Sequence, residues 1–144
     1  MTEAPFRTRR TIVGIMGSHS DNSSALNDAL ALGRAVAKRG YVLLTGGGTG
    51  IMRAASEGAA RSGGLVIGVL PNDKSELIPG YPNEFVHIPI YTGMGDARNA
   101  INAKTPDVII ALQGSFGTAS EIALALKAGT PVISYGAPSV ECPP

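Results

Sequence analysis

The sequence predicts an α/β fold: a single Rossmann-like domain with a doubly wound, mainly parallel sheet and helices on both faces. Short, continuous apolar segments alternate with longer amphipathic segments, which is typical of buried parallel strands joined by crossover helices. Hydrophobic residues make up 44% of the chain but aromatic residues only 5%, so small aliphatic side chains must fill the layers between the helices and the sheet.

Six strands and four helices are expected in alternation. In the first helix Leu26, Leu30 and Val36 recur at helical spacing, and Gly40 ends it because glycine readily adopts a positive φ. The strands are expected at 11–16, 41–45, 65–70, 85–90, 107–112 and 131–135. The helices are expected at 22–39, 50–62, 95–104 and 117–128.

The expected domain has short extensions at both ends. A flexible basic arm is expected at 1–10, the ligand-binding domain at 11–136 and a tail at 137–144. The arm contains three arginines, Arg7, Arg9 and Arg10. We interpret them as a solvated cluster; the alternative is a phosphate-binding patch. The segment 71–84 contains three prolines and is expected to be a long irregular loop, either a plain connection or a lid over a site.

Composition excludes several classes of function. The net charge of +1 gives no global field for nucleic acid or an anionic membrane, so any anion site must be local. The single Cys142 excludes an intramolecular disulfide and a cysteine-based metal cluster, and His19 lacks a second metal ligand at suitable spacing. The apolar run TIVGIMG is too short to span a bilayer, so we expect a cytoplasmic protein without a metal site.

Four unusual turns follow predicted strands: GSHSDNS, GGGTG, GMGDAR and GSFGT. The carboxyl ends of parallel strands lie at one edge of a sheet, and ligands bind there in open α/β folds. These turns are therefore expected to form one site. Helix capping explains the serines and Asn22 of the first turn as well as a role in this site does.

The glycine turn at 46–50 does not fit the common nucleotide-binding motifs. Ile51 occupies the place of the last glycine in the dinucleotide fingerprint, and the Lys-Ser/Thr pair of a P-loop is lacking. Free amide groups and the positive end of the following helix predict an anion site. The alternative is a tight strand-to-helix turn that needs positive φ alone.

Two charged residues near these turns allow a structural and a chemical interpretation each. Glu121 follows Thr118 at the spacing of a capping box, so its structural interpretation is helix capping. In the chemical interpretation it holds a ribose hydroxyl or exchanges a proton. Arg98 stands at a helix start, where the dipole disfavours a cation; it either pairs with Asp96 or holds a phosphate.

The motifs GGGTGIMRAASEGAARSGGLVIGVLP and TGMGDARNAINAKTPDVIIALQGSFGTASEIALALKAGTPVI resemble the Lonely Guy-like, or "lysine decarboxylase-like", Rossmann superfamily over residues 11–135. Its phosphoribohydrolases carry PGGxGTxxE and an upstream Arg-Lys pair. Here Gly114, Gly117, Thr118 and Glu121 match, as does Arg98. Departures from that pattern, namely Asn99, Gln113 and Ser115, make the chain more similar to the branch of molybdenum cofactor carrier proteins.

This resemblance implies a carrier or storage protein for molybdenum cofactor, which binds the phosphate-bearing pterin in a crevice of glycine-rich loops. The alternatives are a nucleoside 5′-monophosphate phosphoribohydrolase, with Arg98 and Glu121 as catalytic residues, or a pocket that binds a nucleotide as a regulatory signal. A homo-oligomer (dimer or tetramer) and a transient molybdoenzyme partner are implied too. The candidate ligand-binding residues are Gly17, Ser18, Gly46, Gly47, Gly48, Thr49, Gly50, Ile51, Met94, Arg98, Asn99, Gly114, Ser115, Phe116, Gly117, Thr118 and Glu121.

Overall fold

The computed structural model describes residues 9–141 and confirms the predicted α/β fold. Six parallel strands form one sheet in the order β4-β3-β2-β1-β5-β6. The strands are β1 Ile12–Met16, β2 Val42–Thr45, β3 Val66–Leu70, β4 Ile88–Tyr91, β5 Val108–Ala111 and β6 Val132–Ser134. The helices are α1 Leu26–Lys38, α2 Ile51–Arg61, the 3₁₀ helix η1 Gly95–Arg98, α3 Asn99–Lys104 and α4 Phe116–Ala128.

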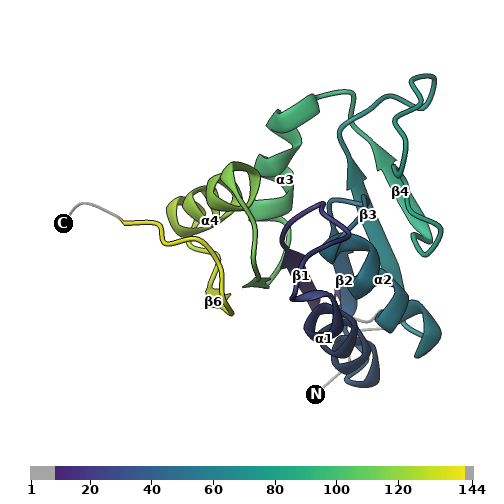
Figure 1. Ribbon diagram of the computed structural model, residues 1–144, viewed down its shortest axis with the longest axis horizontal. Helices are drawn as coiled ribbons and strands as arrows, with labels where there is room; N and C mark the ends of the chain where they lie inside the picture. The colour runs from purple at the N-terminus through teal and green to yellow at the C-terminus, as the bar shows by residue number, and fades with distance from the viewer. Residues whose placement is uncertain (1–8, 142–144) are drawn as a thin grey trace, which may run out of the picture.

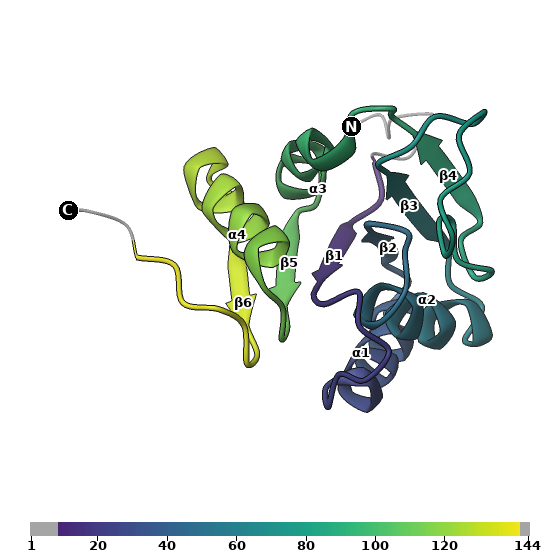
Figure 2. The same ribbon diagram turned by 45° about the horizontal axis from the view of Figure 1, so that its top comes forward.

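The helices cover the two faces of the sheet in pairs (Figures 1 and 2). On one face α1 and α2 pack over a core that includes Ile15 and Leu43. On the other face α3 and α4 pack over Leu44 and Ile109. Each core is built of aliphatic side chains and alanines, as the low aromatic content predicts.

Two glycines bring α1 and α2 into close contact. A β-carbon at Gly33 would lie 2.0 Å from the carbonyl oxygen of Ala55, and one at Gly58 would lie 2.0 Å from that of Leu30. Each helix therefore presents backbone to the other at these positions. This pair of helices packs on β1 and β2.

The predicted helix boundaries need two corrections. The first helix begins at Leu26 rather than 22, because Ser20 and Ser23 accept hydrogen bonds from the amides of Asn22 and Ala25 and form turns before the helix. The predicted helix 95–104 begins as the 3₁₀ helix η1. Arg98 thus lies just before α3.

The strand predicted at 85–90 begins at Ile88 instead. Residues 83–86 form a hydrogen-bonded turn, and sheet pairing starts where the amide of His87 donates to the carbonyl of Val66. Gly40 ends the first helix as predicted, with φ at 75°.

The two ends of the described chain pack against the domain. Arg9 forms an ion pair with Asp107 at 2.7 Å, and Arg10 donates to the carbonyl of Gly40. The tail forms no helix or strand up to residue 141, although Ala137 and Val140 contact the α3–α4 core. Arg7 and Cys142, for which predictions were made, lie outside the described residues. Within residues 9–141, no helix has the length and apolar character needed to cross a membrane.

We predict that Gly33→Ala lowers the free energy of unfolding by about 1–3 kcal/mol, because the added methyl group forces the α1 and α2 backbones apart. Urea denaturation measures this effect. Gly117→Ala is the matched control, since a β-carbon there meets no atom within 4 Å, and it should be at least as stable as the wild type. Equal stability of Gly33→Ala and the wild type would contradict the close helix contact.

Candidate functional site

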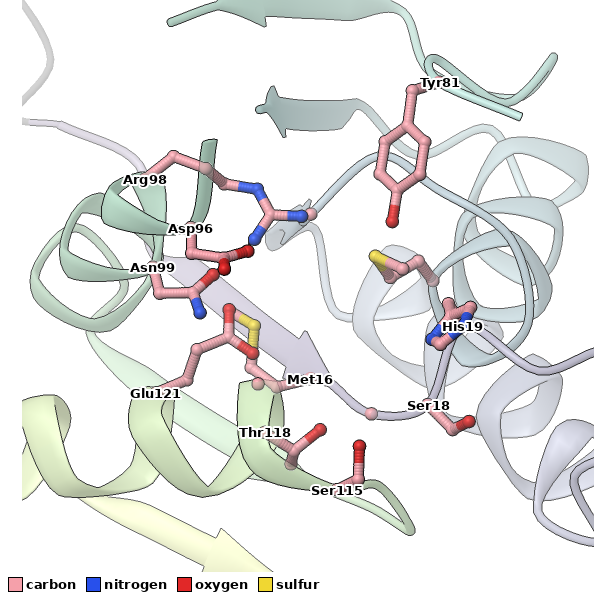
Figure 3. Close-up of a pocket in the computed structure, with 14 residues that line it drawn as sticks. Met16, Ser18, His19, Tyr81, Asp96, Arg98, Asn99, Ser115, Thr118 and Glu121 are labelled. Carbon is pink, nitrogen blue, oxygen red and sulfur yellow. The ribbon is translucent and has the colours of Figure 1, made fainter. Parts of the chain in front are cut away.

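A cavity of about 220 Å³ lies at the carboxyl edge of the sheet, above the end of β1. The strand order reverses at this position, because β1 pairs with β2 on one side and with β5 on the other. The cavity is lined by Met16, Gly17, Ser18, His19, Gly46, Met52, Tyr81, Asp96, Arg98, Asn99, Ser115, Gly117, Thr118 and Glu121. Figure 3 shows Arg98, Asp96, Asn99 and Glu121 on one side, with Tyr81 and His19 opposite.

The N-terminus of α4 opens into the cavity. Its N-cap, Ser115, makes no capping hydrogen bond through its side chain, and the first turn of the helix contains no acidic residue. Ser115, Gly117 and Thr118 from this turn line the cavity. The free amide groups and partial positive charge of a helix start attract an anion, so this end of the cavity favours an oxyanion.

Glu121 lies on the next turn of α4, and the capping-box interpretation is wrong. Its side chain is buried, at 7% exposure, and accepts a hydrogen bond from the amide nitrogen of Asn102 at 2.9 Å. Burial raises the pKa of Glu121 from 4.5 to about 7, against the opposing effects of Asn102 and Arg98. The carboxyl group therefore exchanges its proton near neutral pH.

Arg98 is held in place by a chain of polar side chains. Its guanidinium donates to the side-chain oxygen of Asn99, whose nitrogen donates to Ser120 at 2.9 Å. Ser120 in turn donates to the carbonyl of Gly117. The ion pairs within residues 9–141 do not include the alternative pair of Arg98 with Asp96. Asn99, at the position where the hydrolase motif has lysine, thus connects Arg98 to the first turn of α4.

The glycine turn is largely buried, and three amide groups at its two ends donate within the protein, while its role as an anion cradle stays a prediction. The amide of Gly47 donates to Thr45, that of Gly50 to the carboxylate of Asp21, and that of Ile51 to the carbonyl of Ser18. Asp21 therefore accepts from one of the amide groups predicted to face an external anion. A glycine is required at position 50, where φ is 64° and a β-carbon would lie 2.4 Å from the carbonyl oxygen of Ser18.

Nine of the candidate ligand-binding residues meet at the cavity: Gly17, Ser18, Gly46, Arg98, Asn99, Ser115, Gly117, Thr118 and Glu121. The other eight do not line it: Gly47, Gly48, Thr49, Gly50, Ile51, Met94, Gly114 and Phe116. Phe116 is 91% exposed, and Gly114 makes room for the hydroxyl of Thr118. Whether the nine residues bind a ligand stays a prediction.

Sequence reasoning missed five lining residues: Met16, His19, Met52, Tyr81 and Asp96. Met16 was assigned to a strand and Asp96 to the alternative ion pair with Arg98, while Tyr81 belongs to the irregular segment 71–84. Asp96 is part of the GMGDAR turn, and that position was the available signal for it. No group of three metal-ligating side chains exists among the residues that the structure describes.

A second, more open hollow of about 410 Å³ adjoins the cavity and shares Ser18 and Ser115 with it. Its lining consists of hydroxyl and amide groups and has no charged side chain. Ser23 donates to Gln113 across the hollow at 2.7 Å, which joins the loops after β1 and β5.

Solved structures similar to this chain include molybdenum cofactor proteins. The molybdenum cofactor binding protein of Rippkaea orientalis is 43% identical, with a TM-score of 0.82 over 89% of this chain and 77% of that one. The molybdenum cofactor carrier protein of Chlamydomonas reinhardtii is also 43% identical, with a TM-score of 0.78 over 90% and 78% of the two chains.

Sequence relatives include proteins with and without an assigned activity. An uncharacterized protein of Archaeoglobus fulgidus is 39% identical over 128 residues, which are 89% of this chain and 82% of the relative. A probable cytokinin riboside 5′-monophosphate phosphoribohydrolase of Oryza sativa subsp. japonica is 34% identical over 119 residues, or 81% of this chain. The match spans 47% of that enzyme.

The model of the SLOG cluster4 family matches residues 10–142, which is nearly the whole chain. The chain therefore belongs to the SLOG cluster4 family and, with it, to the Lonely Guy-like superfamily that its motifs resemble.

Proposed function

We propose that this protein is a molybdenum cofactor carrier that binds the phosphate end of the pterin in the cavity above β1. The observation that carries the proposal is the open N-terminus of α4 in the same cavity as the guanidinium of Arg98. A phosphate group accepts hydrogen bonds from both, and a guanidinium can hold it through two parallel bonds. The molybdenum cofactor binding protein and the molybdenum cofactor carrier protein, each 43% identical to this chain, support this choice of ligand.

The sizes of the two hollows support a ligand longer than a phosphate. The main cavity, about 220 Å³, is smaller than the roughly 300–1,000 Å³ of usual small-molecule sites. The adjoining hollow adds about 410 Å³ of polar, uncharged space. A pterin, which has many hydrogen-bonding groups, fits this lining. Because the pterin's own sulfurs hold the molybdenum, the carrier needs no metal ligands of its own.

The alternative function is hydrolysis of the N-glycosidic bond of a nucleoside 5′-monophosphate. Two observations favour it: the sequence relation to phosphoribohydrolases and the buried Glu121, whose pKa of about 7 suits proton transfer. Asn99 argues against it, because the hydrolases of the superfamily have lysine there. We therefore propose a carrier without hydrolytic activity.

We predict that protein purified from cells that make molybdenum cofactor contains molybdenum and pterin. Arg98→Ala should retain at least tenfold less of this cofactor, because a charge-assisted contact with its phosphate is lost. Metal analysis and fluorescence of the oxidised pterin measure both components. Arg39→Ala is the matched control, since this exposed arginine follows α1 away from the cavity, and it should retain as much as the wild type.

A wild type without molybdenum and pterin would contradict the carrier proposal. Incubation with AMP, followed by chromatography for free adenine, tests the alternative in the same samples. Adenine release by the wild type that is lost in Glu121→Gln would establish the hydrolase instead.

We predict that Glu121 makes the stability depend on pH. Its pKa is raised in the folded state, so the folded protein binds more protons than the unfolded chain between pH 4.5 and about 7. Stability from this group is present at low pH and is lost as the pH rises through about 7. The wild type should therefore lose about 3 kcal/mol relative to Glu121→Gln between pH 4 and pH 8 in urea denaturation. If the difference in free energy of unfolding between the wild type and Glu121→Gln were the same at pH 4 and pH 8, the pKa of Glu121 would not be raised.

We also propose a homo-oligomer, formed through the edge of the sheet at β6, and a transient molybdoenzyme as the recipient of the cofactor. Leu126, Ile133 and Tyr135 are exposed at this edge and form an apolar surface that a second copy can cover. Sedimentation velocity should give a dimer or tetramer for the wild type and a monomer for Ile133→Asp. A monomeric wild type would contradict this arrangement.

A further inference from the structure

Tyr81 enters the cavity from the irregular segment between β3 and β4, far in sequence from the other lining residues. Its hydroxyl points into the space between Arg98 and His19 (Figure 3). This position gives the cavity an aromatic wall with a polar tip opposite α4.

The glycine turn provides the surface on which Tyr81 rests. A β-carbon at Gly48 would lie 2.3 Å from Cζ of the Tyr81 ring and 2.6 Å from its hydroxyl oxygen. A β-carbon at Gly80, where φ is 84°, would lie 2.5 Å from the methyl group of Thr49. The absence of side chains at these two positions is therefore what allows the segment to contact the turn.

Asn83 ties the segment to the same turn. Its backbone amide donates to the carbonyl of Gly47 at 2.8 Å, and its side-chain nitrogen donates to the carbonyl of Gly48 at 2.9 Å. Its side-chain oxygen accepts from the amide of Phe85 at 3.0 Å. Asn83 is 5% exposed, so these bonds are buried and costly to break.

A second attachment lies on α2. Arg53 forms an ion pair with Glu84, and the guanidinium groups of Arg53 and Arg61 lie 5.1 and 5.4 Å from the centre of the Phe85 ring. Residues 81–86 are thus held at both the turn and the helix. In this structure they form one wall of the cavity, while the alternatives of a plain connection and a lid both stay predictions.

The chemistry of the Tyr81 hydroxyl suits an anion. Burial raises the pKa of Tyr81, and the nearby Arg98 opposes this rise. The phenol therefore keeps its proton at neutral pH and is able to donate it in a hydrogen bond. Because Arg98 is close by, one tetrahedral anion can contact both groups.

We propose that Tyr81 is a ligand-binding residue whose hydroxyl donates a hydrogen bond to the phosphate monoester held by Arg98, and that Gly48 and Asn83 position it. The proposal rests on the proposed phosphate-bearing ligand and adds a specificity-determining contact to it. Ligands without a phosphate gain nothing from this contact.

Isothermal titration with AMP, inorganic phosphate and adenosine tests the proposal. Tyr81→Phe should raise the Kd for AMP about tenfold and leave the Kd for adenosine unchanged, because one hydrogen bond to a charged group is lost. Tyr41→Phe is the matched control: this tyrosine precedes β2 at the opposite edge of the sheet. Equal AMP affinities of Tyr81→Phe and the wild type, or no binding of either phosphate compound by the wild type, would overturn the proposal.

Gly48→Ala tests the positioning role, since the added methyl group must displace the Tyr81 ring. It should weaken AMP binding about tenfold in the wild type and have no further effect in Tyr81→Phe, as expected for two residues that act through one contact. Additive effects of the two substitutions would show that Gly48 acts on binding in another way.

Metal analysis of the wild type separates this proposal from the carrier function. A wild type that lacks molybdenum but shows the tenfold effect of Tyr81→Phe on AMP would overturn the carrier function alone. Retained molybdenum with equal AMP affinities would overturn the role of Tyr81 alone.

Discussion

The reversal of strand order at β1 determines where this protein can bind a ligand. All strands are parallel, so every loop that follows a strand lies at one edge. The chain leaves β1 for α1 on one face of the sheet and leaves β5 for α4 on the other, so the two loops diverge and open a crevice. The N-terminus of α4, Glu121 and the loop after β1 meet there, and η1 and α3 supply Arg98 and Asn99.

The elements themselves could be predicted from sequence because each has a strong local cause. Apolar runs of four to six residues mark the buried strands, and helical spacing with Gly40 at the end marks α1. The boundaries that were wrong depend on interactions between distant segments or on competing turns. The start of β4 is set by pairing of His87 with Val66, and the start of α1 is delayed by hydroxyl groups that form turns with their own neighbours.

The site could be predicted in part, for the same reason. Turn chemistry and the parallel fold brought Ser18, Arg98 and the α4 turn to one edge, but the sequence could not show whether the amide groups of a glycine turn face solvent or protein. In the turn at 46–50 the amide of Gly50 donates to Asp21, and the carbonyl of Gly48 accepts from the side chain of Asn83, two residues about 30 positions away on either side. Its glycines admit the backbone of the first loop and the ring of Tyr81. A role in positioning a neighbouring segment and a role in cradling an anion produce the same local sequence.

We propose that the anion binds at the start of α4 and not at the glycine turn. Amide chemical shifts of ¹⁵N-labelled protein during titration with inorganic phosphate report which amide groups contact the anion. We expect saturable shifts at Ser115, Gly117 and Thr118, while Gly47 and Gly50, whose amides already donate to Thr45 and Asp21, stay unchanged. Shifts centred on Gly47 and Gly50, or no shift in the α4 turn, would show that the anion binds elsewhere.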